Sequence, residues 1–303
     1  MLIMVRLKAR VVLLVFLCCV ELVQAEISVI DSTGARLTLS RPAQRIVSLT
    51  PHLTELLFAV GAGEQVVGTV DYSDYPPAAL KIPRVGAYNS ISFEAIVNLS
   101  PDLVLAWQSG NGGEMVARLR ALGLPVYVDE PDSLAAIGAS LGKLGQLAGT
   151  EHEAERVMIA YRQKLLDLRR VYSQQRPLSV FYQIWNDPLL TINGEHLISK
   201  VIKLCGGRNV FANAVPLVPT LSVESVIALN PQVIVASSEK HQRREWLKAW
   251  EAWPMLDAVK SGRLYFVPAS LLQRHTPRLL EGAVLLCRQL DEARQQLPAA
   301  DTE

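Results

Sequence analysis

The chain has 303 residues, of which 50% are apolar and 19% are charged, so it can bury one large core or two medium-sized ones. Its formal net charge of +1 provides no basic field of the kind that binds nucleic acid or anionic membrane surfaces. The composition therefore favours a globular protein and argues against those two classes of partner.

The first 25 residues have the pattern of a secretory signal peptide. Basic residues at positions 6, 8 and 10 precede an apolar run over residues 11–20, and small residues before position 26 fit a cleavage site. The run is too short to span a membrane. We therefore expect an exported chain of residues 26–303, with 27 Lys and Arg against 28 Asp and Glu. Lipid attachment at Cys18 or Cys19 is the alternative.

Short apolar runs alternate with helical patterns in the first half of the exported chain. The runs predict strands at 45–49, 66–70, 102–107 and 125–130. Helical periodicity covers residues 53–60, 114–122 and 134–148. Continuously apolar strands indicate a sheet that is covered on both faces, and their alternation with helices predicts an α/β lobe over residues 26–149.

One long helix is predicted in the middle of the chain, within residues 150–174. Residues 151–172 contain no Gly or Pro, and apolar residues recur at spacings of three and four. These residues are Ala154, Val157, Met158, Tyr161, Leu165, Leu168 and Val171. A helix of about 22 residues is roughly 33 Å long. We expect a stiff connection that packs on two lobes and leaves a ligand cleft between them.

The second half repeats the α/β pattern and predicts a second lobe over residues 175–303. Strands are expected at 178–184, 232–237 and 263–268, and helices at 195–204 and 277–295. Cys205 and Cys287 are the only cysteines after residue 25. In an exported chain they suggest one disulfide, with two buried free thiols as the alternative.

A repeat relates the two halves. "SFEAIVNLSPDLVLA" from Ser92 and "SVESVIALNPQVIVA" from Ser222 share five of fifteen residues at an offset of 130. Each copy predicts a serine helix cap, a short helix that ends before a proline, and a buried strand. The repeat places Glu94 and Glu224 at equivalent positions of the two lobes.

The paired glutamates have two interpretations. A carboxylate in the first turn of a helix interacts favourably with the helix N-terminus, by about 0.3–1 kcal/mol. Alternatively, equivalent positions on duplicated lobes present two carboxylates with pseudo-two-fold symmetry, which a symmetric partner with basic pockets can bind. Position alone does not separate the two.

Motifs of catalysis and phosphate binding are missing from the sequence. His52 and His275 lie in loop regions that can face a cleft, where metal ligation is the alternative to a capping or surface role. Aromatic residues follow several predicted strands, where loops of an α/β sheet line a ligand crevice. They are Tyr72, Tyr75, Tyr88, Trp107 and Trp185. Such rings suit a large, flat, partly polar ligand, and core packing is the alternative.

Six segments together resemble the periplasmic cobalamin-binding proteins of bacterial ABC importers, within the wider iron-chelate and cobalamin binding-protein class. They are "RIVSLTPHLTELLFAVG", "DYSDYPP", "IPRVG", "SFEAIVNLSPDLVLAW", "LCGGRNVF" and "SVESVIALNPQVIVAS". The resemblance runs from about Arg45 to Leu290. It implies two α/β lobes bridged by a single long rigid helix, the class III type of periplasmic binding protein.

The resemblance also implies roles for single residues. Glu94 and Glu224 match the positions that contact arginines of the membrane permease subunits. Tyr72 and Trp107 match ligand-contacting aromatic positions, and Cys205 and Cys287 match the family's disulfide. The ligand-contacting loop before the last helix matches Ser270, Leu271, Leu272, Gln273 and Arg274. Tyr88 and Val218 stand where other members have Trp.

These features predict a monomeric periplasmic receptor that is not an enzyme, uses no metal or other cofactor, and carries cobalamin or a related corrinoid as its transported ligand. Haem or a ferric siderophore in the same fold is the first alternative. Haem calls for an axial Tyr or His, and anionic siderophores call for clustered arginines. A periplasmic enzyme with paired carboxylates is the second, and the separate lobes of Glu94 and Glu224 argue against it.

Overall fold

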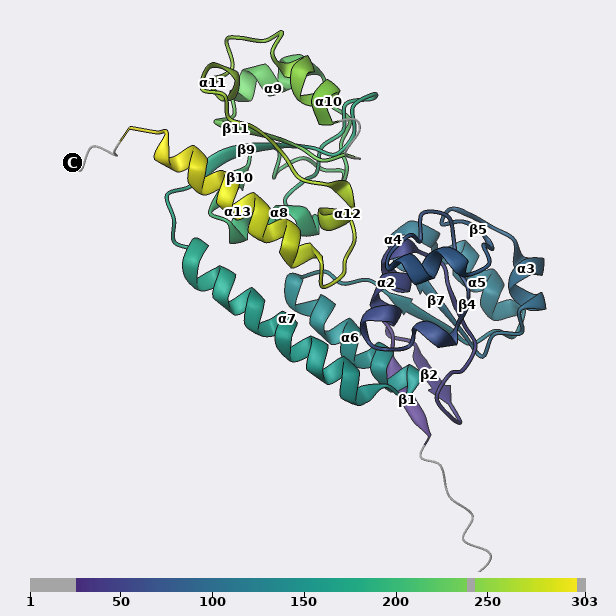
Figure 1. Ribbon diagram of the computed structural model, residues 1–303. Coiled ribbons are helices and arrows are strands. Elements are labelled where there is room, and N and C mark those ends of the chain that lie inside the picture. Colours follow the sequence, from purple (N-terminus) through teal and green to yellow (C-terminus); the bar gives the residue numbers. More distant parts are fainter. Residues whose placement is uncertain (1–25, 239–242, 299–303) are drawn as a thin grey trace, which may run out of the picture.

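The computed structural model describes residues 26–238 and 243–298. The expected signal peptide, with Cys18 and Cys19, lies outside these ranges. The chain forms two α/β lobes that are joined by the long helix α7 (Glu151–Tyr172), as Figure 1 shows. The predicted fold class is therefore confirmed.

The first lobe is built on a four-stranded parallel sheet of order β4-β3-β7-β8. Its strands are β3 (Ile46–Ser48), β4 (Val66–Gly68), β7 (Leu103–Trp107) and β8 (Val126–Asp129). Its helices are α2 (Pro51–Ala59), α3 (Phe93–Asn98), α4 (Gln108–Asn111), α5 (Gly113–Ala121) and α6 (Leu134–Ala148). All the strands and helices predicted here form within two residues of their expected ends.

The second lobe has a parallel sheet of order β10-β9-β11-β12. Its strands are β9 (Leu178–Gln183), β10 (Gly207–Asn209), β11 (Val233–Ala236) and β12 (Leu264–Phe266). Its helices are α8 (Leu197–Leu204), α9 (Val223–Leu229), α10 (Arg243–Trp250), α11 (Asp257–Lys260), α12 (Ala269–Leu272) and α13 (Leu279–Gln295). In chain order within each lobe, both sheets have the arrangement second, first, third, fourth.

The duplicated segments occupy equivalent places in the two sheets. Each repeat supplies a short helix and the third strand of its lobe, α3 and β7 in one and α9 and β11 in the other. Ser92 and Ser222 accept hydrogen bonds from the amides three residues later, as helix caps do. Ser100 and Asn230, which precede the two prolines, both have positive φ. The repeat therefore reproduces local backbone geometry as well as sequence.

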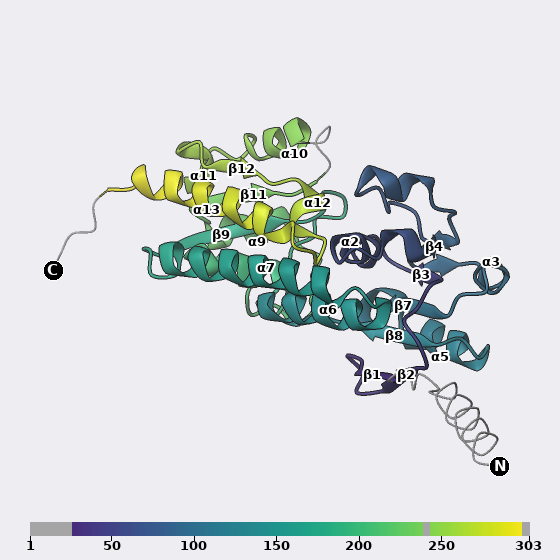
Figure 2. The ribbon, with the colours of Figure 1, turned by 60° about the horizontal axis from the view of Figure 1, so that its bottom comes forward.

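Helix α7 packs on both lobes. It lies along α6 of the first lobe, side by side in Figures 1 and 2, and contacts α8 and α13 of the second. The Tyr161 hydroxyl donates to the Leu134 carbonyl at the start of α6, at 2.7 Å. Of the predicted apolar stripe, Val171 is the exception, because it is half exposed.

A single cluster of buried apolar side chains continues through α6, α7, α8 and α13 into both sheets. Separate smaller clusters cover the remaining faces of the first and second sheets. The two lobes thus share a core beside the bridging helix. Because that core belongs to both lobes, a change at α7 acts on the whole chain rather than on one lobe.

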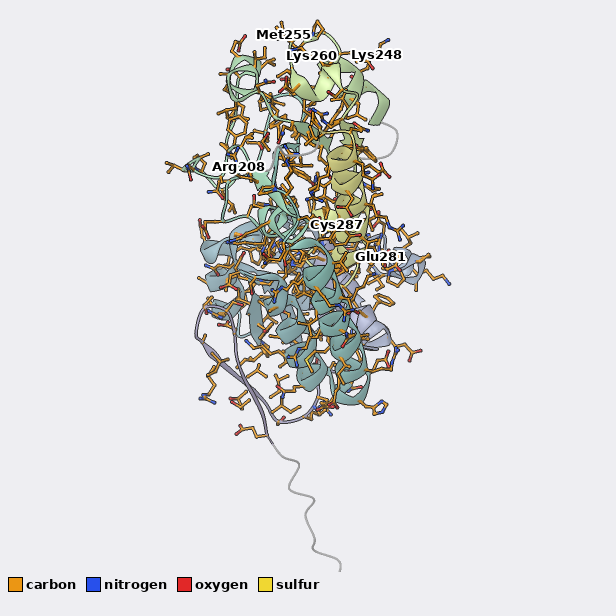
Figure 3. The ribbon with its side chains drawn as sticks, turned by 90° about the vertical axis from the view of Figure 1, so that its left-hand side faces the viewer. Arg208, Lys248, Met255, Lys260, Glu281 and Cys287 are labelled. Atoms are coloured by element: carbon orange, nitrogen blue, oxygen red, sulfur yellow. A yellow bond between two sulfur atoms is a disulfide. The ribbon has the colours of Figure 1, made fainter. Side chains whose placement is uncertain are left out.

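Cys205 and Cys287 form a disulfide with a separation of 82 residues in sequence. It ties the C-terminal cap of α8 to the middle of α13, where Figure 3 labels Cys287. The disulfide prediction is confirmed, and the alternative of two free thiols is wrong.

Several short elements had no sequence prediction. They include the hairpin of β1 (Ile27–Ile30) and β2 (Arg36–Leu39), and the pair β5 (Gly86–Ala87) and β6 (Ser90–Ile91). The outer strand β10 is also among them. These elements are only two to four residues long, so neither run length nor periodicity identifies them. Across the described ranges, no helix is long and apolar enough to cross a bilayer.

Candidate functional site between the lobes

A cavity of about 480 Å³ lies between the two lobes. The first lobe contributes the segments that follow β3 and β4, the turn between β5 and β6, and the end of β7. The second lobe contributes the start of α12 and the loop after it. The lining residues are Thr50, Pro51, His52, Tyr72, Asp74, Tyr88, Trp107, Ala269, Ser270, Gln273 and Arg274.

The strand order explains why these segments meet. In the first sheet the chain goes from β3 to β4 on one side and later to β7 on the other. The carboxyl ends of strands at such a switch point diverge and leave a crevice, which is where α/β sheets bind ligands. Thr50, Pro51 and His52 begin α2 directly after β3, and Trp107 is the last residue of β7.

The predicted aromatic residues of the first lobe come together in this cavity. Tyr72 is 78% exposed and Tyr88 is 44% exposed, so both rings offer free area. Trp107 is half-buried and packs edge-to-face on His52, with 5.1 Å between ring centres. These side chains give the cavity flat apolar walls with polar tips.

The second-lobe predictions divide into two groups. Ser270, Gln273 and Arg274 line the cavity, whereas Leu271 and Leu272 do not. Leu272 is fully buried, and both leucines pack against Gly282 of α13. The two leucines hold the loop on α13. They do not line the cavity, because a helix of four residues turns only one face to it.

Trp185 also lies outside the cavity lining. Its indole is half exposed, donates to the Asp187 carbonyl at 3.0 Å and packs edge-to-face on Trp246 at 6.0 Å. Four other lining residues were not predicted as site residues: Thr50, Pro51, Asp74 and Ala269. The signal that could have found them is their position in segments that follow predicted strands, the same signal that identified Tyr72.

Two histidines from different lobes meet at the edge of this cavity. The rings of His52 and His275 lie 5.6 Å apart, and both side chains are buried. Burial, and then the neighbouring His275 and Arg274, lower the pKa of His52 well below its ordinary value. Burial, and then His196, lower the pKa of His275 to about 4. Both imidazoles are therefore neutral at neutral pH.

Three ring nitrogens of this cluster have no hydrogen-bond partner among the described residues: His52 Nε2, His275 Nδ1 and Trp107 Nε1. The same part of the chain holds no group of three or more His, Cys, Asp or Glu side chains suited to a metal ion. The cluster thus combines buried, unpaired ring nitrogens with a surrounding that lacks the donor set of a metal centre in the described ranges.

A buried ionic network crosses between the lobes beside the cavity. Glu55 of α2 is only 2% exposed, and its carboxylate accepts from Thr276 Oγ1 at 2.5 Å and from Arg278 at 3.2 Å. Arg274 lies 3.7 Å from the same carboxylate and donates to Asp74 at 2.7 Å. Burial raises the pKa of Glu55, while the Thr276 hydrogen bond and the two arginines oppose that rise.

Glu94 and Glu224 stand at the second residue of α3 and of α9, and both are exposed. In Figure 1 the two helices lie far apart, one on each lobe, on the side away from α7. Neither glutamate lines the cavity. Their positions fit contact with a large partner rather than shared chemistry at one centre.

Two α/β lobes on one bridging helix, with a ring-lined cavity between them, define a protein that captures a ligand between its lobes. The chain belongs to the periplasmic binding protein family, whose sequence pattern matches residues 46–271. It is 36% identical over 255 residues to a vitamin B12-binding protein of Vibrio cholerae serotype O1, covering 84% of this chain and 92% of that protein.

Two further comparisons agree with this assignment. A vitamin B12-binding protein of Yersinia pestis is 35% identical over 251 residues, covering 83% of this chain and 88% of the relative. The crystal structure of the periplasmic vitamin B12 binding protein BtuF of Vibrio cholerae superposes with a TM-score of 0.79, covering 84% and 99% of the two chains. The resemblance stated from sequence motifs is therefore confirmed.

The fold is also shared with proteins that carry other ligands. The apo form of the periplasmic heme-binding protein RhuT from Roseiflexus sp. RS-1 has a TM-score of 0.73 at 26% identity. It covers 83% of this chain and 99% of its own. The architecture alone therefore does not identify the ligand, which depends on the residues that line the cavity.

Proposed function

We propose that this chain is a non-enzymatic periplasmic receptor that captures cobalamin or a related corrinoid between its lobes and delivers it to an inner-membrane ABC importer. The observation that carries the proposal is the 36% identity to a vitamin B12-binding protein over 84% of the chain, together with the aromatic cavity. The receptor acts as a monomer, and cobalamin is its transported ligand rather than a cofactor.

The cavity suits a corrin ring in both shape and polarity. Tyr72, Tyr88 and Trp107 cover the apolar faces and edges of the macrocycle, because aromatic side chains supply large contact area at low entropic cost. Ser270 and Gln273 supply hydrogen-bonding groups for its peripheral amides. Trp185, Leu271 and Leu272 are outside this set in the ligand-free protein.

Haem in the same cavity is the second candidate. The similarity to RhuT supports it, as do the tyrosines and the neutral His52 at the cavity, which are the residue types that bind haem iron. The lower identity, 26% against 36%, favours the corrinoid.

The test is to equilibrate the purified protein with cobalamin, haem and ferric chelates, and to measure visible spectra and calorimetric affinity. We expect cobalamin to bind most tightly, with an affinity better than about 1 μM, equivalent to about 8 kcal/mol. Preferential binding of haem or a ferric chelate would contradict the corrinoid assignment while leaving the receptor class intact.

Delivery is proposed to use Glu94 and Glu224 as a symmetric pair of contacts to the two permease subunits. Charge-assisted bonds from arginine to an exposed carboxylate are strong and directional. Replacing both glutamates with alanine should leave cobalamin affinity unchanged and abolish cobalamin uptake by the cell. Weakened cobalamin binding with intact transporter association would reverse this assignment.

A further inference from the structure

Glu55 has a role that the cavity lining does not reveal. It belongs to α2 of the first lobe, yet its carboxylate accepts hydrogen bonds from Thr276 and Arg278 of the second lobe. It does not line the cavity. A carboxylate that is almost fully buried needs such partners, because burial without them is strongly unfavourable. The first lobe thus depends on the second to satisfy its own buried charge.

The groups that satisfy Glu55 also reach the cavity wall. Arg274, 3.7 Å from Glu55, donates to the Asp74 carboxylate at 2.7 Å and to the Tyr72 carbonyl at 3.1 Å. Arg278 places its guanidinium 3.8 Å from the centre of the Tyr75 ring. Two arginines of the second lobe therefore hold the loop of residues 71–76 of the first lobe, and both lie against Glu55.

That loop is in a conformation that needs support. Tyr72 has a φ of +63°, in the left-handed region that a tyrosine rarely adopts. Its carbonyl accepts from Arg274 and from the Asp74 amide, at 3.1 and 3.0 Å. Arg274 of the second lobe therefore stabilises the backbone conformation that carries the exposed Tyr72 ring.

From this arrangement we propose that Glu55 is a positioning residue of the cleft. Through Thr276, Arg278 and Arg274 it fixes the segment 274–278 of the second lobe against the first lobe, and so presents Tyr72 and Asp74 to the ligand in one preformed arrangement. The inference rests on the proposed function only in naming the ligand as a corrinoid. The network around Glu55 is then a non-covalent connection between the lobes, in addition to the covalent connection through α7.

The expected consequence is a loss of affinity without loss of a ligand contact. If the network loosens, the loop of residues 71–76 samples other conformations, and the apparent dissociation constant rises by the inverse of the remaining competent fraction. Glu55→Gln keeps the shape of the side chain and removes the charge that the two arginines face. We expect it to weaken cobalamin binding by roughly tenfold or more, in line with a competent fraction of about one-tenth.

Two readouts separate positioning from general stability. The first is cobalamin affinity by calorimetry, at a temperature where circular dichroism shows each variant fully folded. The second is amide hydrogen exchange of residues 71–75 in the ligand-free protein, with α5 as the internal reference. Glu64→Gln is the matched control, because Glu64 is an exposed carboxylate of the same lobe outside the cavity.

We expect Glu55→Gln to bind weakly and to exchange faster at residues 71–75 only, and Glu64→Gln to behave like the wild type. A folded Glu55→Gln protein that binds within about twofold of the wild type with unchanged exchange overturns the proposal. If Glu55→Gln does not fold, Thr276→Val takes its place, since it removes one hydrogen bond and leaves all charges. A folded Thr276→Val protein with unchanged affinity and exchange then overturns it.

The two proposals fail in different ways. If the wild-type protein does not bind cobalamin, the proposed function is wrong, and the exchange measurement on the ligand-free variants decides the role of Glu55 by itself. If the wild type binds cobalamin and the Glu55 variants show no change in either readout, only the positioning role is wrong.

Discussion

Tyr72 combines a predicted ligand contact with an unfavourable backbone conformation. Left-handed geometry costs a non-glycine residue about 1–2 kcal/mol, and such residues cluster at binding sites. The ring is mostly exposed, so it contributes little to stability in the ligand-free protein. Its conformation therefore serves the cavity rather than the fold.

A pair of substitutions at this position isolates the backbone contribution. Because glycine has no Cβ, Tyr72→Gly should be about 1 kcal/mol more stable than Tyr72→Ala, measured by chemical denaturation. Tyr88 is the control, because it also lines the cavity but does not have a positive φ. There the alanine variant should be the more stable one. The same order of stability at both positions would contradict the strain at Tyr72.

His275 makes stability depend on pH. Its pKa is about 4 in the folded protein against 6.5 ordinarily, so between these values the unfolded chain binds a proton that the folded chain does not. Stability should therefore fall as the pH falls from about 6.5 to 4, by on the order of 3 kcal/mol from this residue. The titratable and charged groups around it include His52, Arg274 and His196.

The measurement is the free energy of unfolding of the wild type and of His275→Gln at pH 7 and at pH 4.5. The variant should lose less stability than the wild type over this interval. His152→Gln, at an exposed position in the first turn of α7, should follow the wild type. Asp129, whose pKa burial raises to about 6, changes stability in the opposite direction in all three proteins and cancels in the comparison. Equal losses in wild type and His275→Gln would show that His275 is not kept neutral by the fold.

At the scale of elements, the contact between α6 and α7 depends on one glycine. A Cβ on Gly145 would stand 2.3 Å from the Cβ of Ala154, far inside contact distance. The next glycine along α6, Gly142, faces Met158 with its sulfur 3.7 Å from the added carbon, which is ordinary contact. The close crossing that fixes α7 on the first lobe is thus local to Gly145.

Matched alanine substitutions test this crossing. Gly145→Ala should destabilise the protein by about 1–3 kcal/mol, because overpacking forces the helices apart. Gly142→Ala should be neutral or stabilising by up to about 1 kcal/mol, because alanine is the better helix former. Chemical denaturation of both variants decides the matter. A Gly145→Ala protein as stable as Gly142→Ala would mean that α6 and α7 are less tightly packed than the structure shows.

For the whole molecule, three features connect the lobes: α7, the shared apolar core and the network around Glu55. Helix α7 contains no Gly or Pro at which a hinge could form. We expect the radius of gyration from solution scattering to be the same, within error, with and without saturating cobalamin. A clear decrease on loading would instead show domain closure and would contradict the rigid connection.

Much of this molecule was predictable because its signals are local. The helix Glu151–Tyr172, the strands of both sheets except β10, and the capped repeats at Ser92 and Ser222 all follow from apolar spacing, proline stops and side-chain caps within a few residues. Short edge elements such as β10 and the β1–β2 hairpin carry too few residues for a periodic signal, and tertiary pairing decides them.

The candidate site was predictable in part. Tyr72 follows a predicted strand and Trp107 ends one, and the carboxyl ends of the strands in a parallel sheet lie at the same edge. Tyr88 was predicted from its loop position instead. The sequence motifs also indicated Ser270, Gln273 and Arg274, but spacing could not show that Leu272 of the same loop turns into the core. Which side of a four-residue helix faces a cavity depends on what packs behind it, here Gly282.

By itself the sequence determined the two-lobed α/β architecture, the bridging helix and the family, because each depends on local patterns or on motif matches along one lobe at a time. Only the tertiary structure decided that the Glu55 carboxylate accepts hydrogen bonds from Thr276 and Arg278, and that the ring of His52 lies beside that of His275. It also decided that Trp185 does not line the cavity. These contacts join residues more than 200 positions apart or follow from the angle between two lobes, and no spacing within a segment encodes such an angle.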